Sequence, residues 1–366
     1  MYPSTGLATA LNSMREMSVK NGSVYHQFVP VVYPDSTTIG EFGQPIIDPA
    51  NTNVLNDFVD LLQKVVYTSV YSKTFNSPLA SLEGERMPLG RFVEDVYVNP
   101  VAPRGFDIND FAGLLQKYES QIAVQYLDVN SDLQYCVTIT RDKIRDAFTS
   151  WNSLEDFITG IVNSLYNGCY ITRYTQVKGL PLAAFQAGAI KYEVITNPTN
   201  EATAKSLIRK IRADYNKMQI PSTKYNAWQD VKGEDAFALQ TWSDPQDLVI
   251  LISADVEALV DVEVLAAAFN LDKDSFLARK ITIDDFSIYD KDGKKTADGS
   301  MIKCALLDKS WFKIKTQDFD VEEFRNPNNR TVQMYLNDRR MVNYSLFANA
   351  KIYTTAEPTP SGSDSE

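Results

Sequence analysis

The sequence has little of what catalytic and metal sites are built from. Its 366 residues include a single histidine, His26, and three widely separated cysteines, Cys136, Cys169 and Cys304. A Ser–His–Asp or Cys–His site would have to use His26, which lies in a segment broken by proline and glycine. An odd, scattered set of cysteines fits neither a disulfide framework nor a zinc site. We therefore predict no catalytic residue, no cofactor and no metal ligand, and interpret the cysteines as small buried hydrophobic residues.

Long apolar runs and an excess of basic residues are also lacking. No apolar run approaches the ~20 residues that span a bilayer, and the N-terminus lacks the charged-then-apolar layout of a secretory signal. We therefore expect a soluble protein, made in the cytoplasm, with no membrane partner. Lys and Arg number 36 against 47 Asp and Glu, a formal charge of −11. Because a protein that grips DNA neutralises phosphates with a basic face, this balance argues against a nucleic-acid-binding enzyme.

The motifs that would indicate phosphate, zinc or calcium binding are missing or incomplete. Residues 290–300, DKDGKKTADGS, resemble a calcium loop, but an EF-hand needs an oxygen ligand fifth and glycine sixth. Here Gly293 is fourth and Lys294 is fifth, and the two Asp-Gly pairs predict a hairpin turn instead. Neighbouring acids such as Glu94 and Asp95 point in different directions and cannot easily flank one bond. An acid-pair hydrolase stays a remote alternative.

The strongest pattern that is present is a long amphipathic helix over residues 150–178. Apolar side chains recur with the 3.6-residue period for about seven turns. Ser153, with Asp156 three residues later, is the candidate N-cap, and Pro181 and Gly188 are expected to end the helix. At ~1.5 Å per residue the helix is roughly 35–40 Å long, which suits a protein whose task is shape. Its core is predicted to contain Leu154, Phe157, Ile158, Ile161, Val162 and Leu165.

Shorter patterns surround this helix. Residues 1–50 are interrupted by proline and glycine and predict an extended arm without long regular elements. Residues 92–98 predict a strand. Residues 121–128 and 133–139 predict a hairpin that turns at 130–132.

The second half of the chain carries a further strong helix and a buried strand. Residues 201–218 predict a helix with one basic face, and residues 248–253 form a continuous apolar run typical of a fully buried strand. Strands and helices occur in segregated runs rather than in strict alternation, so the predicted fold class is α+β. The apolar face of the 201–218 helix comprises Ala204, Leu207, Ile208, Ile211, Tyr215 and Met218.

The amino-acid sequences of several segments resemble those of one protein family. AFTSWNSLEDFITGIVNSLYNG, residues 147–168, is similar to the spine-helix region of major capsid proteins of small tailed phages of the phi29 type. The resemblance recurs in order along the chain, in MPLGRFVEDVYV (87–98), in the segment 247–286, in LLDKSWFKI (306–314), in RNP (325–327) and in FANA (347–350). It implies the Hong Kong 97-like capsid fold and the function of a self-assembling shell subunit. An encapsulin-like nanocompartment shell is the alternative within the same fold.

The same resemblance implies how the chain is divided. The expected parts are an N-terminal arm (1–50), a helix and strand of the peripheral domain (51–74), an extended-loop region (75–140), the peripheral domain with the spine helix (141–195), an axial domain (196–310), further peripheral-domain strands (311–353) and a disordered acidic tail (354–366). Residues 223–245 match the family poorly, and the 290–300 hairpin is longer than its counterpart.

Partners and contact residues also follow from the resemblance. We expect hexamers and pentamers of the chain itself, a scaffolding protein, a portal, and packaged double-stranded DNA held by non-specific proximity, in a virion assembled in the host cytoplasm. The candidate contacts between subunits lie in the arm, the loops and the charged turns: Phe28, Ile46, Glu83, Arg86, Arg91, Asn130, Asp132, Trp228, Trp242, Asp290, Lys294, Lys295, Arg325, Asn328 and Arg330.

Overall fold

The computed structural model describes most of the chain as two compact units. Unit 1 comprises Met1–Asn76, Asp132–Thr172 and Asp318–Arg339, and unit 2 comprises the rest, Ser77–Ser131, Arg173–Gln317 and Arg340–Glu366. The described residues are all those except 1, 52, 60, 62–74, 88–89, 91, 104, 106–116, 234, 260–279, 290–293, 327, 329–330 and 359–366. Residues 62–74 of the expected peripheral-domain segment, 260–279 of the expected axial domain and most of the acidic tail lie outside them.

The long helix is present and is longer than its pattern predicts. Helix α7 (Trp151–Gln186) has 36 residues, about 54 Å at 1.5 Å per residue. It begins one turn earlier than the Ser153 cap would allow, because the hydroxyl of Ser150 accepts from the backbone N–H of Ser153 at 3.1 Å. Ser150 is therefore the N-cap. Leu154 and Leu165 are buried on this helix, and Phe157 is partly buried.

Pro181 does not end α7, contrary to the prediction. It lies inside the helix, where a proline removes one intrahelical hydrogen bond. Leu180, Leu182 and Phe185 around it are buried, and this packing keeps the segment helical, since tertiary burial supplies most helix stability in proteins. The chain turns at Gly188, whose φ is +65°, a conformation that favours glycine.

Residues 1–50 are largely helical, so the prediction of an extended arm is wrong for their secondary structure. Helices α1 (Thr5–Asn21), α2 (Tyr25–Phe28) and α3 (Ile39–Ile47) are followed by the short 3₁₀ helix η1 (Pro49–Asn51), and residues 53–59 are helical. Local caps explain this result. Ser4 caps α1, Gly22 ends it in the left-handed region, and Thr38 with Glu41 forms a capping box on α3. Pro45 lies late in α3, Pro49 begins η1, and Pro3, Pro30 and Pro34 lie outside the helices.

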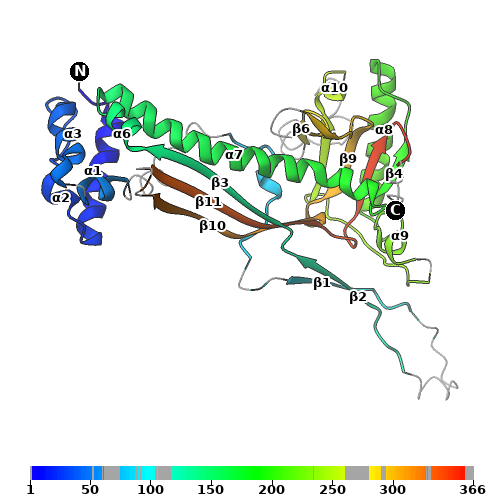
Figure 1. The fold of residues 1–366 in the computed structure, drawn as a ribbon. Coiled ribbons are helices and arrows are strands. Elements are labelled where there is room, and N and C mark those ends of the chain that lie inside the picture. The colour runs from blue at the N-terminus through cyan, green and yellow to red at the C-terminus, as the bar shows by residue number, and fades with distance from the viewer. Residues whose placement is uncertain are drawn as a thin grey trace, which may run out of the picture. The chain divides into compact units, whose positions relative to one another are not determined.

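Unit 1 is built around a three-stranded sheet. Its strand order is β10 (Phe312–Asn326), β11 (Thr331–Tyr344), β3 (Ser131–Thr140), and α6 (Arg141–Ala147) leads from β3 toward α7. Figure 1 shows α7 running along this sheet. Inward-facing residues of β11 join the helix side chains and the N-terminal helices in one buried cluster that includes Val332, Met334, Leu336, Leu154 and Leu165. The core of unit 1 therefore lies between helix and sheet.

The hairpin predicted between 121–128 and 133–139 does not form. Among the described strands, β2 (Ile122–Asp128) pairs with β1 (Phe92–Val98), whereas β3 pairs with β11. Both segments are strands, as predicted, but their partners are distant in sequence. Alternation sets which residues share a face and does not set the partner.

Unit 2 contains a five-stranded sheet whose order is β4 (Lys191–Val194), β12 (Ala350–Thr354), β9 (Ile302–Asp308), β5 (Leu248–Ser253), β6 (Lys280–Ile283). All six residues of β5 are buried, as its apolar run predicts. Helix α8 (Glu201–Met218) buries the whole apolar face named above, in one cluster with Leu248, Ile250 and Ile252. Smaller elements complete this unit: η2 (Ala80–Leu82), α9 (Trp228–Lys232), α10 (Ala254–Glu257), β7 (Ile288–Tyr289), β8 (Lys295–Ala297) and η3 (Lys309–Trp311).

Two short strands lie at the predicted turn over 290–300, β7 before it and β8 within it. Strands β7 and β8 pair antiparallel, with Ile288 opposite Ala297. Among the described residues no group of three or more His, Cys, Asp or Glu side chains is placed to hold a metal ion.

A buried polar network ties α8 to the sheet of unit 2. The carboxylate of Asp214 accepts hydrogen bonds from the hydroxyls of Tyr225 (2.9 Å) and Tyr353 (2.8 Å) and from the ammonium of Lys351 (2.6 Å). Lys351 also donates to Glu193 at 2.7 Å. Burial raises the pKa of both tyrosines, so the phenols stay protonated and serve as donors. Each strong acceptor oxygen in this buried site is thus satisfied.

The pKa shifts of the acids in such networks predict how the stability of the protein depends on pH. Burial disfavours the charged form of Glu193, yet hydrogen bonds from Lys210 and Lys351 outweigh it and lower its pKa. Burial likewise opposes ionisation of Asp284, and hydrogen bonds from Lys178 and Tyr174 lower its pKa. An acid whose pKa is lower in the folded than in the unfolded protein stabilises the fold at pH values above its unfolded-state pKa. It loses that contribution as the pH falls through its folded-state pKa.

We therefore expect the free energy of unfolding to fall as pH is lowered below about 4. Urea unfolding followed by circular dichroism between pH 7 and pH 3 measures this change. The double variant Glu193→Gln, Asp284→Asn should be less stable at pH 7 and should show a flatter pH dependence. An unchanged slope in the variant would remove these two acids from the explanation.

Candidate functional site

The candidate site is a two-stranded ribbon in unit 2, formed by β1 and β2 and called the ribbon below. The strands are antiparallel, with Phe92 opposite Asp128 and Val98 opposite Ile122. Figure 1 shows the two strands side by side, followed by the loop that joins them. Successive side chains of each strand point to opposite faces, so the ribbon has two faces with separate environments.

The inner face of the ribbon is attached to unit 2. Ala123 and Leu127 are buried, and Ala123 belongs to a cluster with Leu346 and Phe347. Asp95 accepts from the ammonium of Lys313 at 3.1 Å and from the hydroxyl of Ser345 at 2.9 Å. The ribbon is therefore fixed at one face by apolar packing and by a charged contact.

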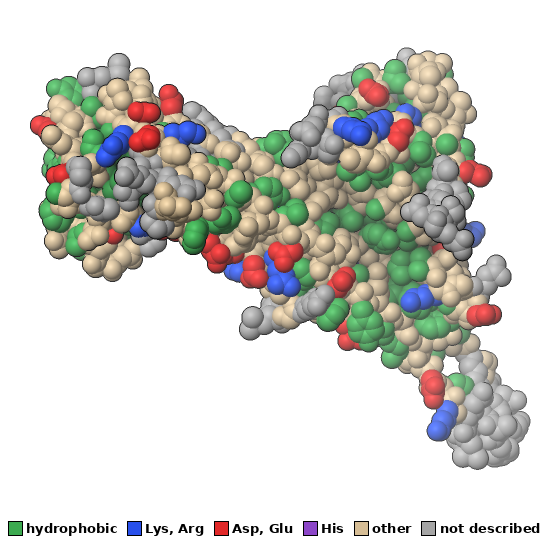
Figure 2. Space-filling model, in the orientation of Figure 1, with side chains coloured by type: hydrophobic (Ala, Val, Ile, Leu, Met, Phe, Trp, Pro, Cys, Tyr) green, Lys and Arg blue, Asp and Glu red, His purple; other side chains and the backbone are tan. Residues whose placement is uncertain are grey.

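The outer face of the ribbon is exposed and carries five apolar side chains beside two exposed carboxylates, Glu94 and Asp128. The exposed fractions are 64 % for Phe92, 50 % for Val96, 57 % for Val98, 53 % for Ile122 and 72 % for Tyr126. We call these five residues the apolar ribbon face. Figure 2 shows hydrophobic side chains gathered where Figure 1 places β1 and β2. Contiguous exposed apolar surface of this kind marks interaction sites.

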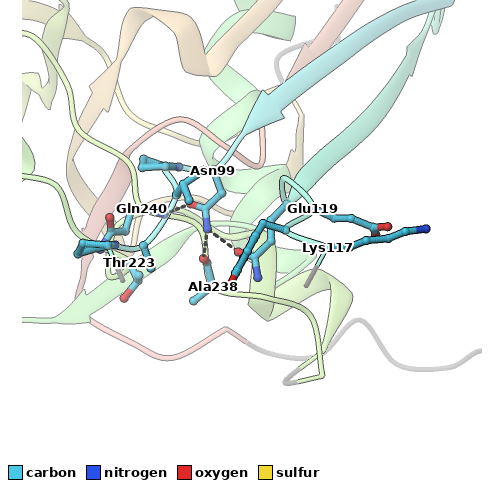
Figure 3. Close-up of a pocket in the computed structure, with 12 residues that line it drawn as sticks. Asn99, Lys117, Glu119, Thr223, Ala238 and Gln240 are labelled. Atoms are coloured by element: carbon cyan, nitrogen blue, oxygen red, sulfur yellow. Dashed lines mark hydrogen bonds between the residues drawn. The ribbon is translucent and has the colours of Figure 1, made fainter. Parts of the chain in front are cut away.

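A cavity of about 600 Å³ lies where the ribbon meets its loop. It is lined by residues of the strand ends and of the 223–240 segment (Figure 3), and Asn99 donates to Gln121 and to the carbonyl of Ala238 within it. Lys117 and Glu119 point away from Asn99 in this view. Its twelve described lining residues include Lys117, Tyr118 and Glu119 but no histidine, cysteine or aspartate.

Two predicted contact residues lie in the core of their own subunit, so these predictions are wrong. Ile46 has no exposed surface, because α3 turns it into the unit 1 cluster. Trp228 begins α9 and packs against Phe347 with ring centroids 5.4 Å apart. Neither side chain is available to a second subunit.

Three further candidates have partners within their own unit. Glu83 pairs with the buried Arg340 at 2.8 Å. Asn130 bonds to the backbone of β11. Arg325 donates to the carbonyl of Asn56 at 2.9 Å and pairs with the neighbouring acid Glu323. These contacts explain the polar residue types without a partner subunit.

The remaining candidates lie on the surface or outside the described part of the chain. Arg86 donates to the carbonyl of Gln317 at 3.1 Å, and Lys295 pairs with Asp298 at 3.1 Å. Exposed positions are Phe28, Asp132, Trp242, Lys294 and Asn328. Outside the described residues are Arg91, Asp290 and Arg330, and the side chains of Ile158, Ile161 and Val162 are likewise not described.

The described contact candidates are divided between the two units, and the apolar ribbon face was missed. The available signal was the composition of 92–98, FVEDVYV, which is apolar on both alternating faces at Phe92, Val93, Val96 and Tyr97. A strand that is apolar on both sides requires cover on both sides. The described chain covers only one.

Comparison with known proteins decides the family. The family model described as Phi29-like phage major capsid protein matches residues 12–354. The chain belongs to this family. Among its relatives, the major capsid protein of Bacillus phage B103 is 27 % identical over 353 residues, 96 % of this chain and 73 % of that protein. That of Bacillus phage PZA is 26 % identical over 357 residues, 97 % and 75 %.

Solved structures agree on the fold of this capsid protein. A chain of the Staphylococcus phage Andhra capsid superposes with a TM-score of 0.61 at 14 % identity, over 77 % of this chain and 85 % of that chain. A chain from the structure of the head fiber and inner core protein of bacteriophage P68 gives 0.60 at 17 % identity, over 79 % and 87 %. The predicted α+β, Hong Kong 97-like capsid fold is confirmed.

The capsid protein is thus a structural subunit of a phage capsid and part of the virion. The prediction of a capsid subunit is confirmed over the encapsulin-like and hydrolase alternatives. No helix among the described residues is long and apolar enough to span a membrane.

Proposed function

We propose that the capsid protein assembles as hexamers and pentamers into a head that encloses double-stranded DNA, and that each apolar ribbon face is covered by a second copy of the chain. Its role in this proposal is structural and not catalytic. Assembly takes place in the host cytoplasm, with a scaffolding protein and a portal as further partners. A shell protein meets mainly its own copies, which supports a second copy as the occupant of the face.

The apolar ribbon face carries the proposal. A two-stranded hairpin is marginally stable alone, and five large hydrophobic residues remain exposed on one side of this one. Covering a Val, Ile or Phe side chain fully contributes roughly 1.5–3 kcal/mol, so the half-exposed members contribute a fraction of that each. Repeated around a closed ring of subunits, such contacts reinforce one another through multivalency.

The division of the chain fits the same proposal. Residues 75–140 contain the ribbon and serve as the extended loop, 196–310 form the axial domain, and 141–195 with 311–353 form the peripheral domain. The N-terminal helices belong to the core of unit 1. In this proposal residues 1–50 therefore form part of the subunit body and not an arm that reaches a neighbouring copy. The residues that remain proposed rim contacts are Phe28, Arg86, Arg91, Asp132, Trp242, Asp290, Lys294, Lys295, Asn328 and Arg330.

The double variant Phe92→Asp, Val96→Asp tests the proposal. Both positions are exposed in the subunit, so its thermal unfolding midpoint should stay within a few degrees of the wild type, whereas two charges would be buried without partners on docking. Negative-stain electron microscopy and sedimentation should show unassembled subunits. The single variant Tyr126→Asp should give the same result if the double variant folds poorly.

Val19→Asp is the matched control, because Val19 on α1 is 55 % exposed and lies outside the ribbon. It should form shells at the wild-type yield. Normal shells from both ribbon variants would contradict the proposal, and so would a loss of shells in the control equal to that in the ribbon variants.

A further inference from the structure

Three side-chain amides along the ribbon bind backbone groups of unit 2 in the manner of an added strand. The first is Gln125, on the inner face of β2. Its Nε2 donates to the carbonyl of Tyr344 at 3.0 Å, and its Oε1 accepts from the N–H of Leu346 at 2.9 Å. A residue of a parallel strand bonds in this way to the C=O of residue n and the N–H of residue n+2.

Asn99 repeats the arrangement at the loop end of the ribbon. Its Nδ2 donates to the carbonyl of Ala238 at 3.1 Å, and its Oδ1 accepts from the N–H of Gln240 at 2.9 Å, again two residues apart. The same Nδ2 donates to Gln121, the residue before β2, at 2.8 Å, and Figure 3 shows these contacts. The hydroxyl of Tyr97 donates to the carbonyl of Gln240.

Asn130 makes the third contact, two residues beyond the end of β2. Its Oδ1 accepts from the N–H of Val342, and its Nδ2 donates to the carbonyl of the same residue, both at 2.9 Å. Two residues that form a hydrogen-bonded pair in an antiparallel ladder exchange the same two hydrogen bonds. Asn343 next to it donates to the carbonyl of Asp128 at 2.9 Å.

The three amide contacts are directional, whereas the apolar packing beneath the ribbon is not. Burial of Ala123 and Leu127 is non-directional, whereas each amide accepts and donates along fixed lines. From the position of Gln121, which bonds to Asn99, to Asn130 the ribbon extends roughly 30 Å at 3.3 Å per residue. Hydrogen bonds at both ends and in the middle of this length fix the orientation of the ribbon relative to the rest of unit 2. Amides do not titrate, so the contacts do not depend on pH.

We propose that Asn99, Gln125 and Asn130 are positioning residues that hold the ribbon at the angle at which its apolar face meets a second copy. This inference rests on the proposed docking of that face. It assigns to the three amides the accuracy of docking rather than the stability of the subunit, because together they set the orientation of the apolar ribbon face relative to the rest of unit 2.

The first test measures the ribbon in the unassembled full-length subunit. Spin labels at Tyr126→Cys on the ribbon and Asn216→Cys on α8 report one distance within unit 2, in a Cys136→Ser background that removes the exposed native thiol. The triple variant Asn99→Ala, Gln125→Ala, Asn130→Ala should broaden or shift this distance distribution. Hydrogen exchange of peptides containing the N–H groups of Gln240, Val342 and Leu346 should accelerate by a factor of about five, the equilibrium value of one ordinary hydrogen bond.

The second test asks whether the change reaches assembly. The triple variant without labels should unfold within a few degrees of the wild type, yet should give fewer shells and a wider range of particle sizes in electron micrographs. Gln134→Ala with Asn337→Ala is the matched control, because it removes a side-chain amide pair at 2.8 Å in unit 1 and leaves the ribbon unchanged. Its distance distribution and its shells should equal those of the wild type.

Gln125→Glu keeps the inference testable if the triple variant fails to fold. The variant keeps the side-chain shape and sets a carboxylate oxygen against the carbonyl of Tyr344, so the distance distribution should broaden in a folded subunit. An unchanged distribution in the triple variant, or in Gln125→Glu where the triple variant does not fold, would overturn the inference. That outcome would leave the proposed function standing, since docking itself is judged by the Phe92 and Val96 variants.

Discussion

Leu165→Asp is expected to prevent unit 1 from folding. Leu165 lies on α7 and is 2 % exposed, in one cluster with the N-terminal helices and with Val332 and Leu336 of β11. Removing the side chain alone would cost about 2–5 kcal/mol, and an unpaired carboxylate in its place adds several kcal/mol more. A domain is stable by only about 5–15 kcal/mol, so the substitution consumes most or all of that margin.

Recovery of soluble chain and its far-ultraviolet circular dichroism measure the result. Ser164→Asp is the matched control, since the neighbouring Ser164 is exposed on the same helix and should tolerate the same charge within about 0.5 kcal/mol. Normal soluble shells from Leu165→Asp would contradict the assignment of α7 as the buried centre of unit 1.

Asp214→Ala is expected to destabilise unit 2 by about 3–5 kcal/mol, the cost of breaking a buried ion pair by removing one partner. The substitution leaves the hydroxyls of Tyr225 and Tyr353 without their acceptor and weakens the pairing of Lys351. Burial opposes the charge on Lys351, yet its hydrogen bonds to Asp214 and Glu193 raise its pKa. Loss of one carboxylate therefore leaves a poorly compensated ammonium.

Chemical unfolding with urea measures the change for the variant. The matched control is Asp230→Ala, which removes an ion pair with Lys191 at 2.6 Å in the same unit, where both side chains are 30 % or more exposed. Exposed pairs contribute about 0–1 kcal/mol, so the control should differ little from the wild type. Equal losses in the two variants would show that the Asp214 network contributes no more than a surface pair.

Elements whose stability is local could be predicted from the sequence. Helix α8 begins and ends at the predicted residues and buries its whole predicted face, because an 18-residue pattern with Asn200 as its cap leaves little choice. The segment 248–253, which is apolar from Leu248 to Ile252, is a buried strand for the same reason. Each of these two features, the helix with its buried face and the buried strand, is determined by the residues of a single segment.

Features that depend on distant segments could not be predicted. The partner of β2 is β1 across a long loop, which no turn signal near 130–132 reveals. The continuation of α7 through Pro181 depends on burial of Leu180 and Phe185 against the rest of unit 2. In residues 1–50, the spacing of prolines suggested an extended arm, whereas the caps at Ser4 and Thr38 determine the helices.

The candidate site was the least predictable part. Charged and aromatic residue types selected Trp228 and Glu83, and both have partners in their own unit. The apolar ribbon face, by contrast, becomes evident only when pairing shows which alternate residues of β1 and β2 share a side. An amide such as Asn130 looks like a surface residue in sequence, because its partner Val342 is more than two hundred positions away.

A cryo-electron microscopy reconstruction of the assembled shell tests the central claim most directly. The solvent exposure of Phe92, Val96 and Tyr126 in the shell is the quantity to measure. The account predicts that each is buried against a neighbouring copy, from half-exposed or more in the subunit. A shell in which these side chains still face solvent would contradict it.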